Sequence, residues 1–333
     1  MSAAELRGSA AGGSCLRRYA ARNASLVLSY LVLAVMGLYY VSYALGHGQL
    51  SVFSVTSVFN NTMPLLIAAI GQTFVVLTGG IDLSVGSIIS LTNSLAAVYM
   101  KDTLSSSLGW SGLILLVGSA AGAVNGLLVA VGRIQPILVT LASLSIWAGA
   151  ALFVLPQPGG AIPLGFTAVL AGNAWNVVPA SAVTLLVLIG FWMLFRRTGL
   201  AVALYAVGDD ERSARANGVP VVAAKIAAYA LSGLFAALAG LYLSAVTTSG
   251  DATTGAVYTL TSIAAVVLGG VSLFGGRGSA AGSMAGAFVL TLIVNILFFA
   301  NINPLLQEFF QGLVLILAMA ASVLVNLLLG RAG

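Results

Sequence analysis

Charge is what this sequence has least of. Only 6% of its 333 residues are Asp, Glu, Lys or Arg, whereas 60% are hydrophobic and the mean hydropathy is +1.08. A soluble domain carries about a quarter charged residues, and a single core of this size cannot hide so much apolar surface from water. The composition therefore excludes a soluble protein and leaves room for about ten membrane spans of ~20 residues each.

Three reactive residue types are also scarce. Cys15 is the single cysteine, His47 the single histidine, and Lys101 and Lys225 are the two lysines. One cysteine excludes an internal disulfide. A lipoprotein signal has an apolar stretch before its cysteine, and because none precedes Cys15 we interpret this residue as having no special function. One histidine leaves no hydrolytic triad and no metal cluster. Neither lysine follows a glycine, so a phosphate-binding loop is absent and the chain does not hydrolyse ATP by that route itself.

The apolar segments predict an all-α protein that crosses the membrane about ten times. The polar, basic residues 1–23 are predicted to form a cytoplasmic tail, since the apolar run after them is longer than a signal-peptide core. Residues 24–330 form the predicted polytopic domain. Its expected spans are 24–45, 60–78, 83–100, 111–132, 137–155, 177–195, 221–246, 257–274, 280–300 and 306–330.

The basic residues predict the orientation. If the N-terminus is cytoplasmic and the spans alternate, twelve of the thirteen Lys and Arg residues fall on the cytoplasmic side, and only Lys101 falls outside. The positive-inside rule expects this distribution. The net charge of +5 therefore reports topology, with both termini cytoplasmic, and does not indicate a nucleic-acid partner.

Glycines recur at helical spacing within the predicted spans. Gly118, Gly122 and Gly126 share one face, as do Gly282 and Gly286. Small residues at this spacing allow helices to approach closely in lipid. Two uses are open, packing inside one subunit or a dimer face, and the spacing favours the first.

The first motif runs from Thr78 to Ser87, where two glycines and Asp82 interrupt apolar sequence. A charge at membrane depth is costly and faces the protein interior or a cavity, but Asp82 can also cap the next helix. The cap reading is favoured over the path reading, and both can hold. Polar residues within spans each bridge helices more often than they line a path. The candidates for a translocation path are Gln72, Thr73, Asp82, Ser84, Asn93, Asn125 and Asn295.

The second motif is a charged helix within the loop 196–220. Asp209 or Asp210 is expected to cap it, and Gly218 and Pro220 end it. Asp209 to Arg212 and Glu211 to Arg215 have the spacing of helical ion pairs. A short charged helix suits docking into a partner, whereas the simpler alternative is a solvated surface helix. The residues expected to contact the partner are Gly208, Asp209, Asp210, Glu211, Arg212, Ala214, Arg215 and Gly218.

The third motif, Ile263 to Ser279, repeats the pattern of the first: Val-Val-Leu, two glycines, an aliphatic residue, a polar residue and leucine. Its glycines predict a tight turn with close backbone approach.

With these motifs, the sequence resembles the ribose-type permeases of bacterial ABC importers, in the sugar branch of the branched-chain amino acid and sugar permease family. The resemblance covers about residues 50–330 and is most specific at Gly71–Ser87. Further matching segments are Asn125-Gly126, Arg133–Pro136, Val139–Leu141, Ala206–Val219 and Ile263–Gly282. Two departures stand out. Thr259 and Thr261 occupy positions where the family often has acids, which leaves room for a heterodimer, and Asp210 replaces the usual asparagine.

The resemblance implies the partners. They are a second permease copy, two cytoplasmic ATPase subunits that bind ATP and Mg²⁺, and an extracytoplasmic sugar-binding protein. The helix at 210–217 would dock on the ATPases, and the outer loops near 46–58, 155–176 and 247–256 would receive the sugar. The resemblance predicts a non-enzymatic permease subunit that translocates a monosaccharide across the bacterial plasma membrane: a ribose-like pentose, a hexose or a related sugar. An ion-gradient-driven secondary transporter is the alternative, in which Asp82 would be the candidate ion or proton site.

Overall fold

The structure is a computed structural model. It describes residues 24–48, 50–174, 178–300, 302–303, 306, 309–310, 312–313 and 316. The predicted tail 1–23 with Cys15, and most of the predicted span 306–330, lie outside the described residues.

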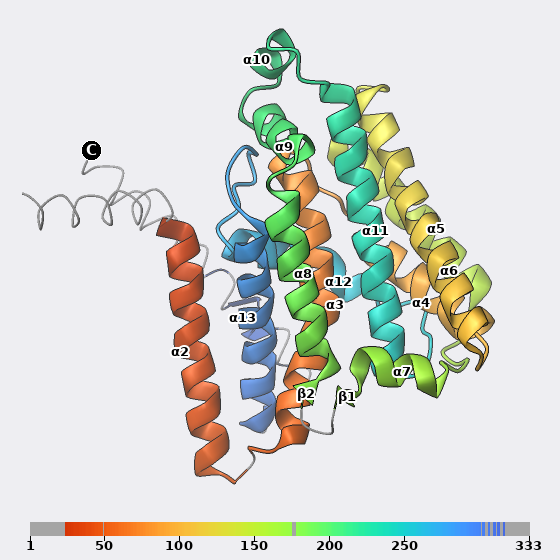
Figure 1. The fold of residues 1–333 in the computed structure, drawn as a ribbon, viewed down its shortest axis with the longest axis vertical. Helices are drawn as coiled ribbons and strands as arrows, with labels where there is room; N and C mark the ends of the chain where they lie inside the picture. The colour runs from red at the N-terminus through yellow and green to blue at the C-terminus, as the bar shows by residue number, and fades with distance from the viewer. Residues whose placement is uncertain are drawn as a thin grey trace, which may run out of the picture.

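The described chain is almost entirely helical, as predicted (Figure 1). Its helices are α2 (Ala24–Gly46), α3 (Val52–Leu77), α4 (Val85–Tyr99), α5 (Leu104–Ala130), α6 (Pro136–Val154), α7 (Leu164–Ala171), α8 (Ala180–Phe195), α9 (Gly199–Asp209), α10 (Glu211–Ala216), α11 (Val221–Thr247), α12 (Ala256–Leu268) and α13 (Ala280–Phe299). Two short antiparallel strands, β1 (Asn173–Ala174) and β2 (Val178–Pro179), join α7 to α8.

Six helices, α2, α3, α5, α6, α11 and α13, are long and apolar enough to cross a membrane. The pair α8 and α9, bent by 74° at their junction, raises the number to seven. The predicted spans 83–100 and 257–274 are shorter in the structure, because α4 has 15 residues and α12 has 13. At 1.5 Å per residue these helices extend about 20 Å, less than the ~30 Å hydrocarbon layer. The described residues therefore leave the predicted number of ten spans unconfirmed.

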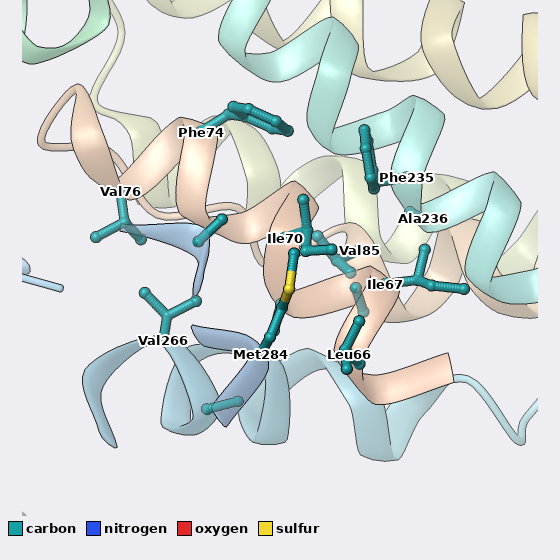
Figure 2. Packing of buried hydrophobic residues seen from close by; sticks show 14 of the residues in the cluster. Leu66, Ile67, Ile70, Phe74, Val76, Val85, Phe235, Ala236, Val266 and Met284 are labelled. Carbon is teal, nitrogen blue, oxygen red and sulfur yellow. The ribbon is translucent and has the colours of Figure 1, made fainter. Parts of the chain in front are cut away.

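The core lies around α3, whose residues from Met63 to Leu77 are buried. Figure 2 shows Ile70 of α3 between Phe235 of α11 and Met284 of α13, and Phe74 of α3 packs against Phe235 with ring centroids 5.5 Å apart. Because lipid is as apolar as these side chains, close packing between helices rather than exclusion of water stabilises such a core.

The glycine face of α5 packs on α11 of the same chain. A Cβ on Gly122 would lie 2.0 Å from the carbonyl oxygen of Tyr229, and one on Gly118 would lie 2.5 Å from that of Gly233. Gly282 and Gly286 meet α12 in the same way. The favoured prediction, that these glycines pack helices inside one subunit, is confirmed.

Candidate functional site

The first helix break, residues 78–84, begins where α3 ends. The N–H of Gly80 donates to the carbonyl of Val75 (3.2 Å) and that of Gly79 to Val76 (2.9 Å), and Gly79 has φ +80°. This is a Schellman ending, which needs a left-handed residue and therefore favours glycine. The third motif ends α12 identically: Val271 donates to Val266 and Gly270, with φ +80°, donates to Val267. The repeat seen in the sequence is thus a repeated way of ending a helix.

Asp82 is completely buried within this break. Its Oδ1 accepts hydrogen bonds from the N–H (3.0 Å) and the hydroxyl (2.6 Å) of Ser84, and its Oδ2 accepts one from Ser232 of α11 (2.8 Å). Gln72, with its amide oriented to match its neighbours, donates to the carbonyl of Asp82 (3.1 Å) and accepts from its N–H (3.2 Å). Asp82 therefore closes the turn directly before α4. The prediction that it caps this helix is wrong, because Ser84 is the N-cap of α4 and no side chain caps it, and the place of Asp82 on a translocation path stays a prediction.

The network continues from Ser84 into two more helices. Asn125 of α5 donates to the Ser84 hydroxyl (2.9 Å) and accepts a short hydrogen bond from Ser143 of α6. Both side chains are buried. Buried polar groups need such partners because leaving one unpaired costs about 1–3 kcal/mol. The structure thus brings four of the seven predicted path residues together: Gln72, Asp82, Ser84 and Asn125.

The remaining three path candidates lie elsewhere. Thr73 shares a hydrogen bond with Ser283 of α13 (2.7 Å), and the half-buried Asn295 donates to the carbonyl of Thr291 (2.9 Å) on its own helix. Asn93 of α4 lies at a second break in the helices.

The second break, residues 248–255, separates α11 from α12. It opens with Thr248 in the left-handed region (φ 56°). Gly250 then exchanges two main-chain hydrogen bonds with Gly159 (2.8 and 2.9 Å). Asp251 Oδ1 accepts from the N–H and the hydroxyl of Thr253, both at 2.7 Å. These two bonds hold the pKa of Asp251 below its ordinary value, so this carboxylate is ionised near neutral pH.

Asn93 ties the second break to α4. Its amide donates to the Ser244 hydroxyl (2.8 Å) and the Ser249 carbonyl (3.3 Å), and its oxygen accepts from the N–H of Asp251 (2.7 Å). A cavity of about 150 Å³ lies at this position, lined by Asn93, Pro158, Leu243, Thr247, Ser249, Gly250, Asp251 and Thr254.

Sequence reasoning missed Ser232 and Asp251. Ser232 sits within an apolar helix and gives no local signal. Asp251 does give one, because Asp251-Ala252-Thr253 before α12 repeats the pattern of Asp82-Leu83-Ser84 before α4.

The predicted charged helix is α10, and it projects from one end of the helical bundle (Figure 1). Asp210 caps it, accepting from the N–H of Arg212 (2.9 Å) and the hydroxyl of Ser213 (2.6 Å). The Ser213 hydroxyl and then the Arg212 N–H hold the pKa of Asp210 below its ordinary value. Gly218, with φ +80°, ends the helix, because its N–H and that of Val219 close a Schellman motif.

Ion pairs hold α10 in place. Glu211 pairs with Arg215 (3.1 Å), as predicted, and also with Lys225 of α11 (2.6 Å). The other predicted pair, Asp209 with Arg212, is wrong: between these two described residues the structure has no ion pair. Asp209 ends α9 and Asp210 is extended (φ −155°), so the two residues do not share a helix.

Of the residues predicted to contact a partner, Arg212 and Arg215 are exposed, whereas Ala214 is buried. The exposed surface of α10 therefore carries two arginines, with the capping Asp210 and Asp209 of α9 exposed beside them, and Ala214 anchors the helix to the bundle.

Gly208, just before α10, contacts the end of α3. A Cβ on Gly208 would lie 1.9 Å from the carbonyl oxygen of Leu77 and 2.5 Å from the nitrogen of Gly276. The N–H of Gly276, in the loop after α12, donates to that same Leu77 carbonyl (3.0 Å). Main-chain atoms at the base of α10 therefore contact main-chain atoms at the start of the first break. Because no side chain lies between them, a change of rotamer cannot absorb a displacement of α10.

Comparison with known proteins gives a consistent result. Residues 54–319 match the family described as "Branched-chain amino acid transport system / permease component". The ribose import permease protein RbsC of Escherichia coli K12 is 34% identical over 276 residues, 80% of this chain and 85% of the relative. RbsC of Bacillus subtilis is 35% identical over 75% of this chain and 78% of its own length. The autoinducer 2 import system permease protein LsrC of an Enterobacter species is 36% identical over 85% of this chain and 83% of the relative. No solved structure matches the chain.

Proposed function

This chain belongs to the family of branched-chain amino acid transport system permease components, and we propose that it is the permease subunit of an ATP-driven importer for a monosaccharide. Its six long apolar helices and its bacterial relatives place it in the bacterial inner membrane as a multi-pass protein. The relatives that match over most of the chain are named for the import of ribose and of autoinducer 2, which supports a small, hydroxyl-rich cargo.

The observation that carries the proposal is α10. A six-residue helix is marginal by itself, yet this one has a cap at each end and an ion pair to Lys225. Its exposed arginines and acids form a preorganised surface suited to a groove on another protein. We infer that this partner is a cytoplasmic ATPase subunit, so that the end of the bundle with α10 faces the cytoplasm.

The proposed mechanism is alternating access without covalent chemistry in this chain. Two permease copies, identical or different, would be moved by two ATPase subunits and supplied by an extracytoplasmic sugar-binding protein. A displacement of α10 would reach Leu77, at the end of α3, through Gly208 and Gly276. The packed helices have discrete arrangements rather than a soft continuum, so such a displacement can shift the whole bundle between states.

The test removes Arg215 from the docking surface together with the Glu211 ion pairs that hold α10 in place, and leaves the contacts of the membrane-spanning helices unchanged. Glu211→Ala with Arg215→Ala should reduce ATP-driven uptake to background and abolish co-purification of the ATPase, while the permease still reaches the membrane. A double variant at the opposite end, Lys101→Ala with Asp102→Ala, is the matched control and should keep the ATPase bound.

Two outcomes would contradict the proposal. Full uptake by the α10 variant would remove the coupling role. Uptake that survives ATP depletion and is abolished by proton uncouplers would favour the secondary transporter instead.

A further inference from the structure

We propose that the cavity at the second break is a binding subsite for one neutral sugar ring, that Asp251 is its principal recognition residue, and that the buried Asn93 holds its wall in place. This inference deepens the proposed function and rests on it. Irregular backbone inside a helical membrane protein is tolerated where it is buried in protein or lines a cavity. The first break is filled by its own side chains, whereas the second leaves about 150 Å³ open beside Asp251.

The lining has the chemistry of a sugar site. It combines the carboxylate of Asp251 with hydroxyls of Thr247, Ser249 and Thr254, and the buried Asn93 forms part of its wall. A carboxylate accepts two hydrogen bonds side by side and a hydroxyl both donates and accepts, which suits neighbouring hydroxyls on a ring. Pro158 and Leu243 supply an apolar surface for the C–H face of that ring.

The charge of the cavity selects against anions. None of its lining residues is Lys, Arg or His, and the ionised Asp251 carries one negative charge. A phosphorylated sugar or a sugar acid would bring a second negative charge to the same small volume, which costs free energy. The cavity is therefore suited to an uncharged polyol or sugar.

The walls of the cavity are held before any ligand arrives. Asn93 is only 1% exposed, and three hydrogen bonds fix its amide. The paired hydrogen bonds of Gly159 and Gly250 join the two loops that form the rim. A preorganised site loses less conformational freedom on binding, so recognition does not require the loops to order first.

The position fits the direction of transport. The cavity lies at the end of α11 away from α10, and α11 has 27 residues, about 40 Å of helix. Near the same end, Tyr242 donates to the carbonyl of Leu170 in α7 (2.7 Å), and Figure 1 shows α7 opposite α10. If α10 meets the ATPase, the cavity is extracytoplasmic. Its volume equals that of about five liquid waters, which is close to the size of one sugar ring.

Protection of an introduced thiol tests the subsite directly. In a Cys15→Ser background, the complete transporter in nanodiscs carries Thr254→Cys in the cavity or, as a control, Asp102→Cys on an exposed loop. A maleimide labels each thiol with and without D-ribose, D-glucose or myo-inositol, and isosmolar glycine betaine controls for crowding. We expect at least one of the three probes to slow labelling at 254 about tenfold when present at ten times its Kd, with no change at 102.

The second variant separates recognition from folding. Adding Asp251→Asn to Thr254→Cys should remove the protection while the transporter stays assembled. If Thr254→Cys does not assemble, Ser249→Cys reports on the same cavity. Absence of protection by all three probes would overturn the subsite, whatever the uptake. Absence of ATP-driven uptake of every sugar, with protection intact, would overturn the proposed function and not the subsite.

Discussion

Asp82 and Asp251 occupy equivalent places in two helix breaks and differ in what surrounds them. Each precedes a short helix, and each accepts hydrogen bonds from the N–H and the hydroxyl of the residue two positions later. Asp82 is then sealed by Ser232 and is completely buried. Asp251 instead borders an open cavity.

The comparison separates what the local sequence determines, the turn, from what tertiary contacts determine, the surroundings of the carboxylate. The pattern Asp-x-Ser/Thr closes a turn in both places and for the same reason, directly before α4 in the first break and two residues before the start of α12 in the second. Whether the carboxylate then becomes structural or accessible depends on neighbours far away in sequence. Ser232, 150 residues from Asp82, fills the second side of the first carboxylate. In our proposal, a sugar fills that role at the second.

The largest difference between the breaks should appear when each carboxylate is removed. Asp82→Ala leaves the hydroxyls of Ser84 and Ser232 without their acceptor in a buried site, at a cost of about 1–3 kcal/mol for each orphaned group. We expect a lower midpoint of thermal unfolding in detergent, followed by size exclusion, and less protein in the membrane. Asp251→Ala should lose much less stability, because water can reach the donors it leaves.

Asp82→Asn is the matched control, since its amide keeps an acceptor for Ser84 and can donate to Ser232. It should lose less stability than Asp82→Ala. An Asp82→Ala protein with normal stability and no uptake would contradict the structural role and favour the path reading.

A smaller effect is expected where the two breaks touch. A Cβ on Gly255 would lie 2.2 Å from the carbonyl oxygen of Gly86 and 2.6 Å from the nitrogen of Ser90. Main-chain atoms cannot rotate away, so Gly255→Ala should cost about 1–3 kcal/mol by overpacking, measured as the same thermal midpoint. It would push α12 from α4 and change the cavity.

Gly109→Ala is the control for that substitution. Gly109 has no atom within 4 Å of the added Cβ, and alanine in a helix is favoured over glycine by about 0.5–1 kcal/mol. Gly255→Ala should therefore lower the thermal midpoint, whereas Gly109→Ala should raise it slightly. A neutral Gly255→Ala would mean that the two helix starts are not in close contact.

Much of the fold was predictable because its signals are local. The apolar segments, the Schellman glycines and the capped charged helix depend on residues close in sequence, and α10 forms where it was predicted. The lengths of α4 and α12 were overestimated, since hydropathy continues through the breaks and only hydrogen bonds show where the helices end. The pair Asp209 with Arg212 was wrong because one extended residue, Asp210, separates their helices.

The candidate site was predictable only in part. Asp82 was found because a lone carboxylate in apolar sequence is conspicuous, but its partner Ser232 is one of many serines. The path candidates were chosen by polarity, which does not distinguish a side chain that bridges helices from one that faces a cavity. Of those seven, Asn93 lines the cavity at the second break, and its contacts with Ser244 and Asp251 arise from tertiary structure.

The smallest expected effect is the pH dependence of Asp251. The hydrogen bonds from Thr253 lower its folded-state pKa below the ordinary 3.8. A lowered pKa contributes stability that is fully present above the unfolded value and is lost as the pH falls through the folded value. The thermal midpoint of the wild type minus that of Asp251→Asn should therefore be constant from about pH 8 to pH 5 and shrink only at more acidic pH. Thr253→Val keeps the main-chain donor and loses the hydroxyl, so it should reduce this difference without removing it. If this difference in thermal midpoint already changes between pH 5 and pH 8, a group other than Asp251 must titrate there and affect the stability of the second break. The two aspartates would then be alike only in the turns that they close.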